Sequence, residues 1–270
     1  NVPLLDLCKV NKIYENGHHA VKDVSFEIEP GMLVGLIGPN GCGKSTMMKC
    51  INRLHGTTSG DILIDGVTML DKKPGEVAKI VASVPAELKA SFGLTVFEPV
   101  MLGRYPYLKN IWWETEQDED LVSETLKKFG VYHLRDRPLN MLSSGERQRV
   151  LITKAYVQEP RLMLVDEPTS HLDMKYKLDV MEYLYAMVRT DMTILVAEHD
   201  ISLMARYCDL CIIMKEGSIV AIGPPKKVIT SELIEDVYGV SASVGYDGDG
   251  EMFVLPKRYK AESMESRKSH

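Results

Sequence analysis

The sequence has no long apolar run, no excess of positive charge and few cysteines, and each lack argues against a class of protein. No stretch approaches the roughly 18 apolar residues that a membrane-spanning helix needs. Lys and Arg number 32 against 38 Asp and Glu, a formal net charge of −6, so we expect no nucleic-acid partner, which would need a concentrated basic face. The five cysteines are irregularly spaced, which fits a reducing compartment better than a disulfide framework.

The N-terminal residues also lack the charged, apolar and small-residue sections of a signal peptide. What is present is an ordinary globular composition, with 45% hydrophobic and 26% charged residues in 270 residues. This length is enough for one large domain or two modest ones. We therefore expect a soluble chain of the cytoplasm.

The hydrophobic pattern predicts an α/β core. Residues 4–14 and 21–29 mix apolar and polar positions around a turn, as a hairpin or meander does. Residues 32–37 are a continuous apolar run ending in glycine, typical of a buried strand, and a helix is expected over 44–54. Strands and helices then alternate, over 162–165, 174–188, 193–197, 201–207 and 210–214, which indicates a mostly parallel sheet.

Two further regions interrupt or follow this core. The pattern is helical from about 87 to 159, with helices predicted over 94–104, 118–129 and 145–158 and the acidic run 114–120 as a solvated helix start. Near the C-terminus, residues 238–256 contain a hairpin signal. We expect one domain over 1–256, with an inserted helical lobe, and a polar tail over 257–270.

The strongest motif lies between the strand at 32–37 and the helix that follows it. It satisfies G-x-x-x-x-G-K-[ST] with Gly38, Pro39, Asn40, Gly41, Cys42, Gly43, Lys44, Ser45 and Thr46. The glycines let the backbone turn its N–H groups toward phosphates, and the helix N-terminus adds its positive dipole end. Lys44 can reach the β- and γ-phosphates, and the Ser45 hydroxyl can ligate Mg²⁺. We therefore predict nucleotide binding at this phosphate loop, residues 38–46.

A second segment ends an apolar strand in two acids. Asp166, at the carboxyl end of the strand, can hold Mg²⁺ directly or through water. Glu167 can orient the attacking water or accept its proton. Taken alone, the segment fits a solvated acidic turn as well as a catalytic one; the phosphate loop favours the catalytic interpretation.

Residues 142–149 (LSSGERQR) lie between these two segments, and the three together resemble the ATP-binding subunits of ABC transporters over nearly the whole chain. The resemblance implies a phosphate-loop ATPase core with a mostly parallel sheet, an antiparallel β subdomain and an inserted helical lobe within a nucleotide-binding domain. It also implies that two copies sandwich two ATP molecules with Mg²⁺. Ser143 and Gly145 of one copy would then contact the γ-phosphate bound by the other.

Three further positions agree with this family. Residues 170–173 (SHLD) resemble its D-loop, and residues 198–200 (EHD) resemble its switch-histidine segment, which implies that His199 senses the γ-phosphate. Tyr14 matches the aromatic residue that stacks on adenine. An aromatic residue in an N-terminal strand is otherwise often part of the core.

Two positions depart from the family. Ser144 replaces the first glycine of the signature, and serine fits there unless φ must be positive. Ala86 replaces a glutamine that touches Mg²⁺ and the attacking water, and alanine can do neither. Either Glu87 swings in, water fills the gap, or the site hydrolyses slowly. We expect basal hydrolysis slower than in relatives with the glutamine, with nucleotide affinity near normal.

Residues 92–98 (FGLTVFE), 102–106 (LGRYP) and 237–240 (VYGV) resemble one subfamily, the importers of iron–siderophore, haem and cobalamin. This resemblance implies an ATPase that powers such an importer together with membrane permease subunits and a substrate-binding protein, at the cytoplasmic face of the membrane. Two alternatives stay open. One is a soluble ABC-type ATPase, and the other is a weakly hydrolysing, nucleotide-gated module that is not coupled to transport.

Overall fold

A six-stranded sheet forms the centre of the computed structural model, which describes residues 2–86, 93–107, 115–190 and 192–258. Its order is β10-β9-β3-β8-β7-β6, and β9, β3, β8, β7 and β6 run parallel, whereas β10 pairs antiparallel with β9. The strands are β3 (Leu33–Ile37), β6 (Val81–Val84), β7 (Leu162–Asp166), β8 (Thr193–Glu198), β9 (Leu210–Lys215) and β10 (Ser218–Gly223). The predicted α/β fold with a mostly parallel sheet is confirmed.

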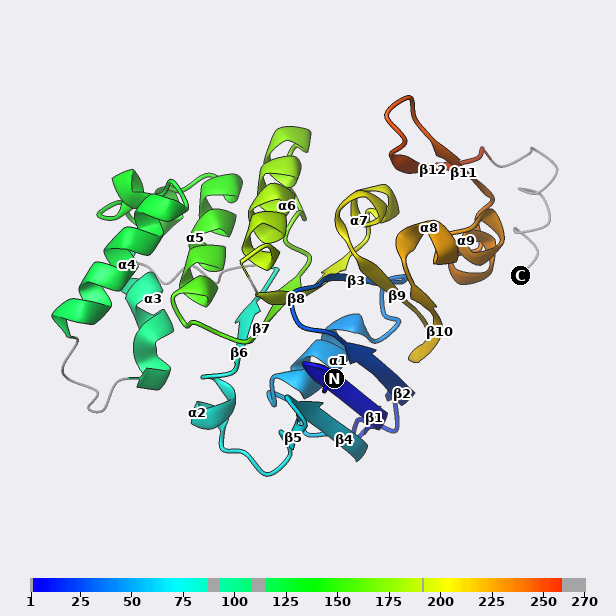
Figure 1. The fold of residues 1–270 in the computed structure, drawn as a ribbon, viewed down its shortest axis with the longest axis horizontal. Coiled ribbons are helices and arrows are strands. Elements are labelled where there is room, and N and C mark those ends of the chain that lie inside the picture. The colour runs from blue at the N-terminus through cyan, green and yellow to red at the C-terminus, as the bar shows by residue number, and fades with distance from the viewer. Residues whose placement is uncertain (1, 87–92, 108–114, 191, 259–270) are drawn as a thin grey trace.

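An antiparallel sheet of order β2-β1-β4-β5 lies beside the central one (Figure 1). It consists of β1 (Leu5–Ile13), β2 (His19–Ile28), β4 (Ser59–Ile64) and β5 (Val67–Thr68). Buried residues of this sheet, of helix α1 (Lys44–Ile51) and of the central strands form one hydrophobic cluster, which includes Ile62, Met47 and Val34. The apolar face of α1 therefore joins the two sheets directly behind the phosphate loop.

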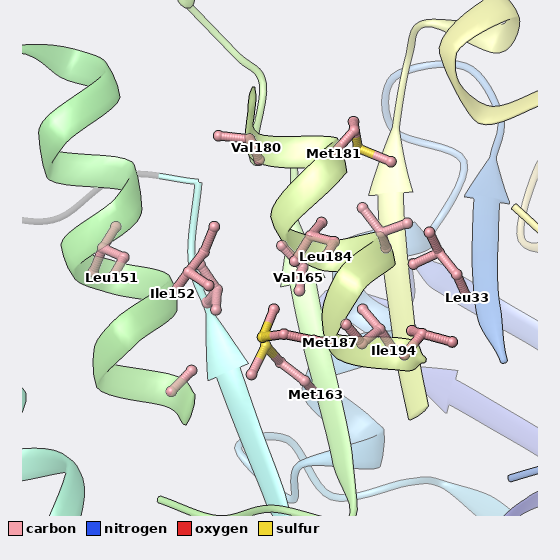
Figure 2. Packing of buried hydrophobic residues seen from close by; sticks show 14 of the residues in the cluster. Leu33, Leu151, Ile152, Met163, Val165, Val180, Met181, Leu184, Met187 and Ile194 are labelled. Carbon is pink, nitrogen blue, oxygen red and sulfur yellow. The ribbon is translucent and has the colours of Figure 1, made fainter. Parts of the chain in front are cut away.

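A second hydrophobic cluster covers the other face of the central sheet. It includes buried residues of α5 (Ser144–Tyr156), α6 (Met174–Val188) and α7 (Ile201–Tyr207). Figure 2 shows Leu184 and Met187 of α6 against Val165 of β7 and Ile194 of β8. Every residue of β8 is buried, so the sheet is packed on both faces, as expected for parallel strands.

The helices α3 (Phe97–Met101), α4 (Glu116–Lys128) and α5 lie together at one end of the molecule (Figure 1). The helix predicted over 94–104 is wrong in extent, because only α3 is α-helical and a 3₁₀ helix (Leu102–Tyr107) follows it. Gly103 and Pro106 both disfavour a continued α-helix there. Short 3₁₀ helices, Tyr132–Leu134 and Leu139–Met141, connect α4 to α5.

The acidic start of α4 is not wholly solvated, which corrects the sequence prediction. Asp118 is only 9% exposed, and its Oδ1 accepts a hydrogen bond of 2.9 Å from Arg104 Nε. Arg104 Nη1 also donates to the carbonyl oxygen of Val157 at 2.7 Å and to Glu159 Oε2 at 2.6 Å. The buried guanidinium thus ties three segments of this helical region together.

The remaining elements lie at the sheet edges and near the C-terminus. The sequence analysis did not identify α2 (Pro74–Val77), β6 or β10. Two helices, α8 (Pro225–Val228) and α9 (Ser231–Tyr238), precede the predicted hairpin. The hairpin consists of β11 (Ala242–Tyr246) and β12 (Met252–Pro256). It contacts α7 through a 2.9 Å hydrogen bond from Val254 N to Ser202 Oγ. Within the ranges given above, no helix is long and apolar enough to cross a membrane.

Candidate functional site

Most of the predicted site residues lie at the carboxyl edge of the central sheet. Strands β3, β8 and β7 are neighbours, so the segments that follow them lie side by side. The phosphate loop follows β3, Glu167 follows β7, and His199 follows β8. A pocket of about 350 Å³ opens between them, lined by Tyr14, His18, Ala20, Asn40, Gly41, Gly43, Lys44, Ser45, Thr46, Glu167 and His199.

The phosphate loop needs its glycines for conformation and for close packing. Gly41 (φ 78°) and Gly43 (φ 108°) adopt the left-handed region that glycine occupies without strain. A Cβ atom on Gly43 would lie 2.3 Å from the carbonyl oxygen of Ala20, and one on Gly38 would lie 2.4 Å from that of Met214. The loop is therefore pressed against neighbouring backbone, with its curvature set before any ligand binds.

Lys44 provides a buried positive charge at this loop. Its side chain donates from Nζ to the carbonyl oxygens of Gly38 (2.6 Å) and Pro39 (3.2 Å), and the residue is 6% exposed. In the part of the chain that the structure describes, Lys44 makes no salt bridge. A buried ammonium with only neutral acceptors is costly. An anionic phosphate against the loop would compensate that charge, so the residues present fit a nucleotide.

The side-chain oxygens of Ser45 and Asp166 lie close together, and both can ligate a metal ion. Ser45 Oγ donates to Asp166 Oδ1 at 3.3 Å. Burial raises the pKa of the Asp166 carboxyl above its usual range, and the Ser45 hydrogen bond opposes this shift. Mg²⁺ prefers oxygen ligands and is usually held by one or two protein groups together with substrate phosphates. The donor set fits such an ion.

Both carboxylate oxygens of Glu167 are held by neighbouring side chains. His199 Nε2 lies 2.6 Å from Oε1, and Ser170 Oγ donates to Oε2 at 3.2 Å. When the carboxylate is ionised it only accepts, and the imidazole then donates from Nε2. Glu167 also has a φ of 46°, a conformation that is costly for a residue with a side chain. Its backbone is fixed there by a 2.9 Å hydrogen bond from its N–H to the carbonyl oxygen of Ala197.

The sequence analysis gave no structural role to two residues that support this site. Glu198 is 3% exposed, and its carboxylate accepts from the backbone N–H groups of Thr169 (2.8 Å) and His199 (3.1 Å), which joins the loops after β7 and β8. An acid at the end of a strand whose other residues are apolar except for Thr193 is the signal that could have identified it. Tyr238 of α9 has a buried hydroxyl behind the phosphate loop, near Gly38, and burial raises its pKa.

Tyr14 lies at the pocket rather than in the core. Its hydroxyl is 3.1 Å from Thr46 Oγ1 in helix α1. Its ring stacks on that of His18, with centroids 6.3 Å apart and an interplanar angle of 11°. The ring of Tyr14 therefore presents a flat face at the pocket. Tyr14 is not part of either hydrophobic cluster, so it is not the core residue that the sequence also allowed.

Six predicted site residues do not line this pocket. Gly38, Pro39, Cys42 and Asp166 belong to the phosphate loop and the end of β7, whereas Ser143 and Gly145 belong to the start of α5. Ser143 is exposed and caps α5, since its Oγ accepts from Glu146 N at 3.3 Å and its N–H donates to Glu146 Oε2 at 2.8 Å. Gly145 is buried, and a Cβ there would lie 2.6 Å from the ring of Tyr176. Ser144 begins the helix without a positive φ, so serine fits that position as expected. Glu87, one candidate to replace the missing glutamine, lies outside the described residues.

Comparisons with known proteins give independent evidence on the family of the chain. A sequence profile described as "ABC transporter" matches residues 21–170. The chain is 38% identical over 225 residues to an uncharacterized ABC transporter ATP-binding protein of Methanocaldococcus jannaschii, with 83% of this chain and 87% of that protein covered. It is 35% identical over 224 residues to the ferric enterobactin transport ATP-binding protein FepC of Escherichia coli, with 83% of each chain covered.

A solved structure has the same fold. It is described as the dimeric structure of a post-hydrolysis state of an ATP-binding cassette bound to ADP and Pi. The TM-score is 0.73 at 29% identity, and the match covers 82% of this chain and 98% of the other.

Proposed function

Because the chain belongs to the ABC transporter family as an ATP-binding subunit with ATPase activity, we propose that it powers an importer of metal chelates of the iron–siderophore, haem or cobalamin type. One observation supports the ATPase activity: the segments after three adjacent strands bring Lys44, Glu167 and His199 to one pocket. The similarity to the ferric enterobactin protein supports the cargo class. No residue of this chain is expected to touch the cargo.

The roles of the site residues follow from their chemistry. Lys44 and the loop N–H groups of residues 38–46 would bind the β- and γ-phosphates. Glu167 would orient the attacking water and accept its proton, since His199 and Ser170 fix its carboxylate. His199 would also sense the γ-phosphate. Lys44, Glu167 and His199 all line the pocket in which the nucleotide phosphates would lie.

We propose that Ser45 and Asp166 hold Mg²⁺ together with the nucleotide phosphates. The ion would supply positive charge to the phosphate oxygens when it is bound. The raised pKa of Asp166 agrees with this role, because a buried carboxylate without a cation is disfavoured. A bound cation would restore the charged form.

The functional unit is proposed to be a dimer with two composite sites. Ser143 is exposed at the N-terminus of α5 and lines no part of its own chain's described pocket. A helix start with an exposed hydroxyl suits an anionic phosphate of another copy. Gly145 packs against Tyr176 of its own chain, so its proposed contribution is the backbone N–H at that helix start. The relative described as a dimer supports this assembly.

We propose that the dimer works at the cytoplasmic face of a membrane, held there by permease subunits, with a substrate-binding protein in the full system. The test reconstitutes the dimer with the membrane protein that co-purifies with it. Turnover should rise when a ferric chelate or cobalamin is supplied with its binding protein. Turnover unaffected by any membrane partner would favour a soluble ABC-type ATPase, and binding without turnover would favour the nucleotide-gated module that Ala86 suggests.

Tyr14→Ala is expected to raise the dissociation constant for ATP about tenfold, because stacking on a base contributes about 1–3 kcal/mol. Tyr14→Phe keeps the ring and loses only the contact with Thr46, so its affinity should stay within about threefold. Affinities are measured by calorimetry for ATP and for inorganic triphosphate. Equal weakening of both ligands by Tyr14→Ala would contradict adenine stacking.

A further inference from the structure

The first turn of the phosphate loop packs against the end of strand β9 and the turn that follows it. The N–H of Gly217, in that turn, donates to the carbonyl oxygen of Cys42 at 2.9 Å. A Cβ atom on Gly38 would lie 2.4 Å from the carbonyl oxygen of Met214 and 2.6 Å from Cys42 Sγ. Gly38, Cys42 and Met214 do not line the nucleotide pocket. This contact therefore supports the loop from behind.

Helix α9 is fixed to the same end of β9. Lys215, the last residue of β9, makes a salt bridge of 2.8 Å from its Nζ to Asp236 Oδ1 of α9. Val237 is buried in the hydrophobic cluster that also includes residues of α7. The helix ends at Tyr238, because Gly239 (φ 67°) adopts the left-handed conformation of a C-cap glycine. Tyr238 is therefore the last residue of a helix that is anchored to the strand behind the loop.

The Tyr238 hydroxyl lies close to the phosphate loop but makes no hydrogen bond of ordinary geometry. Its oxygen is buried and has no hydrogen-bond partner among the residues that the structure describes. Burial and the nearby Cys42 raise the pKa of this hydroxyl, and the backbone N–H of Gly38, which faces the oxygen, opposes the rise. The hydroxyl oxygen has lone pairs that can accept from that N–H. Hydrogen bonds at functional sites are often poorly aligned in the free protein and tighten when the ligand binds.

We propose that Tyr238 is a positioning residue for the phosphate loop, and that its hydroxyl oxygen accepts from the N–H of Gly38 when nucleotide binds. In the free protein Lys44 Nζ donates to the carbonyl oxygen of Gly38 at 2.6 Å. When Lys44 turns to the phosphates, Gly38 loses that contact, and the bond to Tyr238 holds its peptide group in place. This inference rests on the proposed function, in which residues 38–46 bind the phosphates. It also gives a role to the segment 237–240 (VYGV), which the ATPase chemistry does not use.

Tyr238→Phe tests the contact, because phenylalanine keeps the ring and removes the oxygen. We expect the dissociation constants for ATP and for inorganic triphosphate each to rise about fivefold, which corresponds to one lost hydrogen bond. The nucleotide-free Tm should stay unchanged or rise slightly, since the hydroxyl has no partner in the free protein. KM for ATP should rise with kcat within about twofold, because Glu167 and His199 are untouched. Calorimetry, thermal unfolding and phosphate release measure these effects.

Tyr207→Phe is the matched control. The Tyr207 hydroxyl of α7 donates to Glu182 Oε1 of α6 at 2.8 Å, away from the phosphate loop. Its removal should lower the nucleotide-free Tm slightly and leave both dissociation constants unchanged. The two tyrosine variants thus separate a hydroxyl that serves the fold from one that serves nucleotide binding. Tyr14→Ala marks the base end of the site, because it should weaken the binding of ATP and not that of triphosphate.

Three outcomes for Tyr238→Phe would overturn the inference. The first is an affinity for both ligands equal to that of wild type. The second is a loss of affinity for ATP alone, which would place the effect at the base. The third is a lowered nucleotide-free Tm, which would show that the hydroxyl serves the fold. Wild-type protein that binds ATP without turnover would overturn the proposed ATPase role instead, and the binding data would still decide the role of Tyr238.

Discussion

Glu167→Gln is expected to lower kcat by about 10³-fold while ATP still binds. General-base catalysis contributes about 10²–10⁴-fold, and an amide cannot accept the proton of the attacking water. The substitution preserves size, and the amide oxygen can still accept from His199 Nε2, which lies 2.6 Å from the carboxylate. The phosphate loop and Lys44 are untouched, so affinity should stay within a few-fold. Phosphate release and calorimetric binding of ATP measure the two effects separately.

The matched control is Glu182→Gln, at an exposed glutamate of α6 whose Oε1 accepts from Tyr207 away from the pocket. Its turnover should equal that of wild type. A kcat of Glu167→Gln near the wild-type value would refute the role of this carboxylate. Size-exclusion chromatography with Mg²⁺ and ATP adds a second readout, because the blocked variant should accumulate as a closed dimer. A monomer with ATP bound would contradict the composite site.

The parallel core was predictable because its signals are local in the sequence. Continuous apolar runs mark strands buried on both faces, and β3, β7 and β8 were each placed within one or two residues. The G-x-x-x-x-G-K-[ST] pattern describes one turn between one strand and one helix. Its neighbours along the chain therefore suffice to identify it.

The edges of the fold were not predictable in the same way. Strand β6 has four residues, and β10 has only half-buried and exposed positions, with no buried one, next to a turn. Both strands are defined by the neighbour with which they pair, which is distant in sequence for β6. Asp118 likewise looks solvated until Arg104, from another segment, is folded against it.

Contacts between segments that are distant in sequence also decide what the site contains. The role of Glu198 depends on Thr169, which approaches it only when β7 and β8 pair. The sequence left three outcomes open for Ala86. Only the folded chain shows that Ala86 lines a cavity together with residues of α5 and of the loop after β7.

Lys44→Ala is expected to weaken ATP binding by 10²-fold or more. A charge-assisted hydrogen bond contributes about 1.5–3 kcal/mol, and Lys44 would make such bonds to two phosphates. No other Lys or Arg lines the pocket among the described residues, so no neighbour can replace the charge. Calorimetric titration with ATP measures the loss. Lys49→Ala is the matched control, because Lys49 is an exposed lysine of the same helix, and it should bind ATP as wild type does.

Thermal unfolding separates loss of the ligand from loss of the fold. In the free protein the Lys44 ammonium is buried against two neutral carbonyl groups, so its removal should leave the nucleotide-free Tm unchanged or slightly raised. A ligand that binds only the folded state raises stability by RT ln(1 + [L]/Kd), so 1 mM ATP should raise the Tm of wild type and of Lys49→Ala much more than that of Lys44→Ala. An equal rise in all three proteins would show that ATP binds without the phosphate loop. A lowered nucleotide-free Tm confined to Lys44→Ala would show that the buried lysine serves the fold and would weaken the assignment of its charge to phosphate.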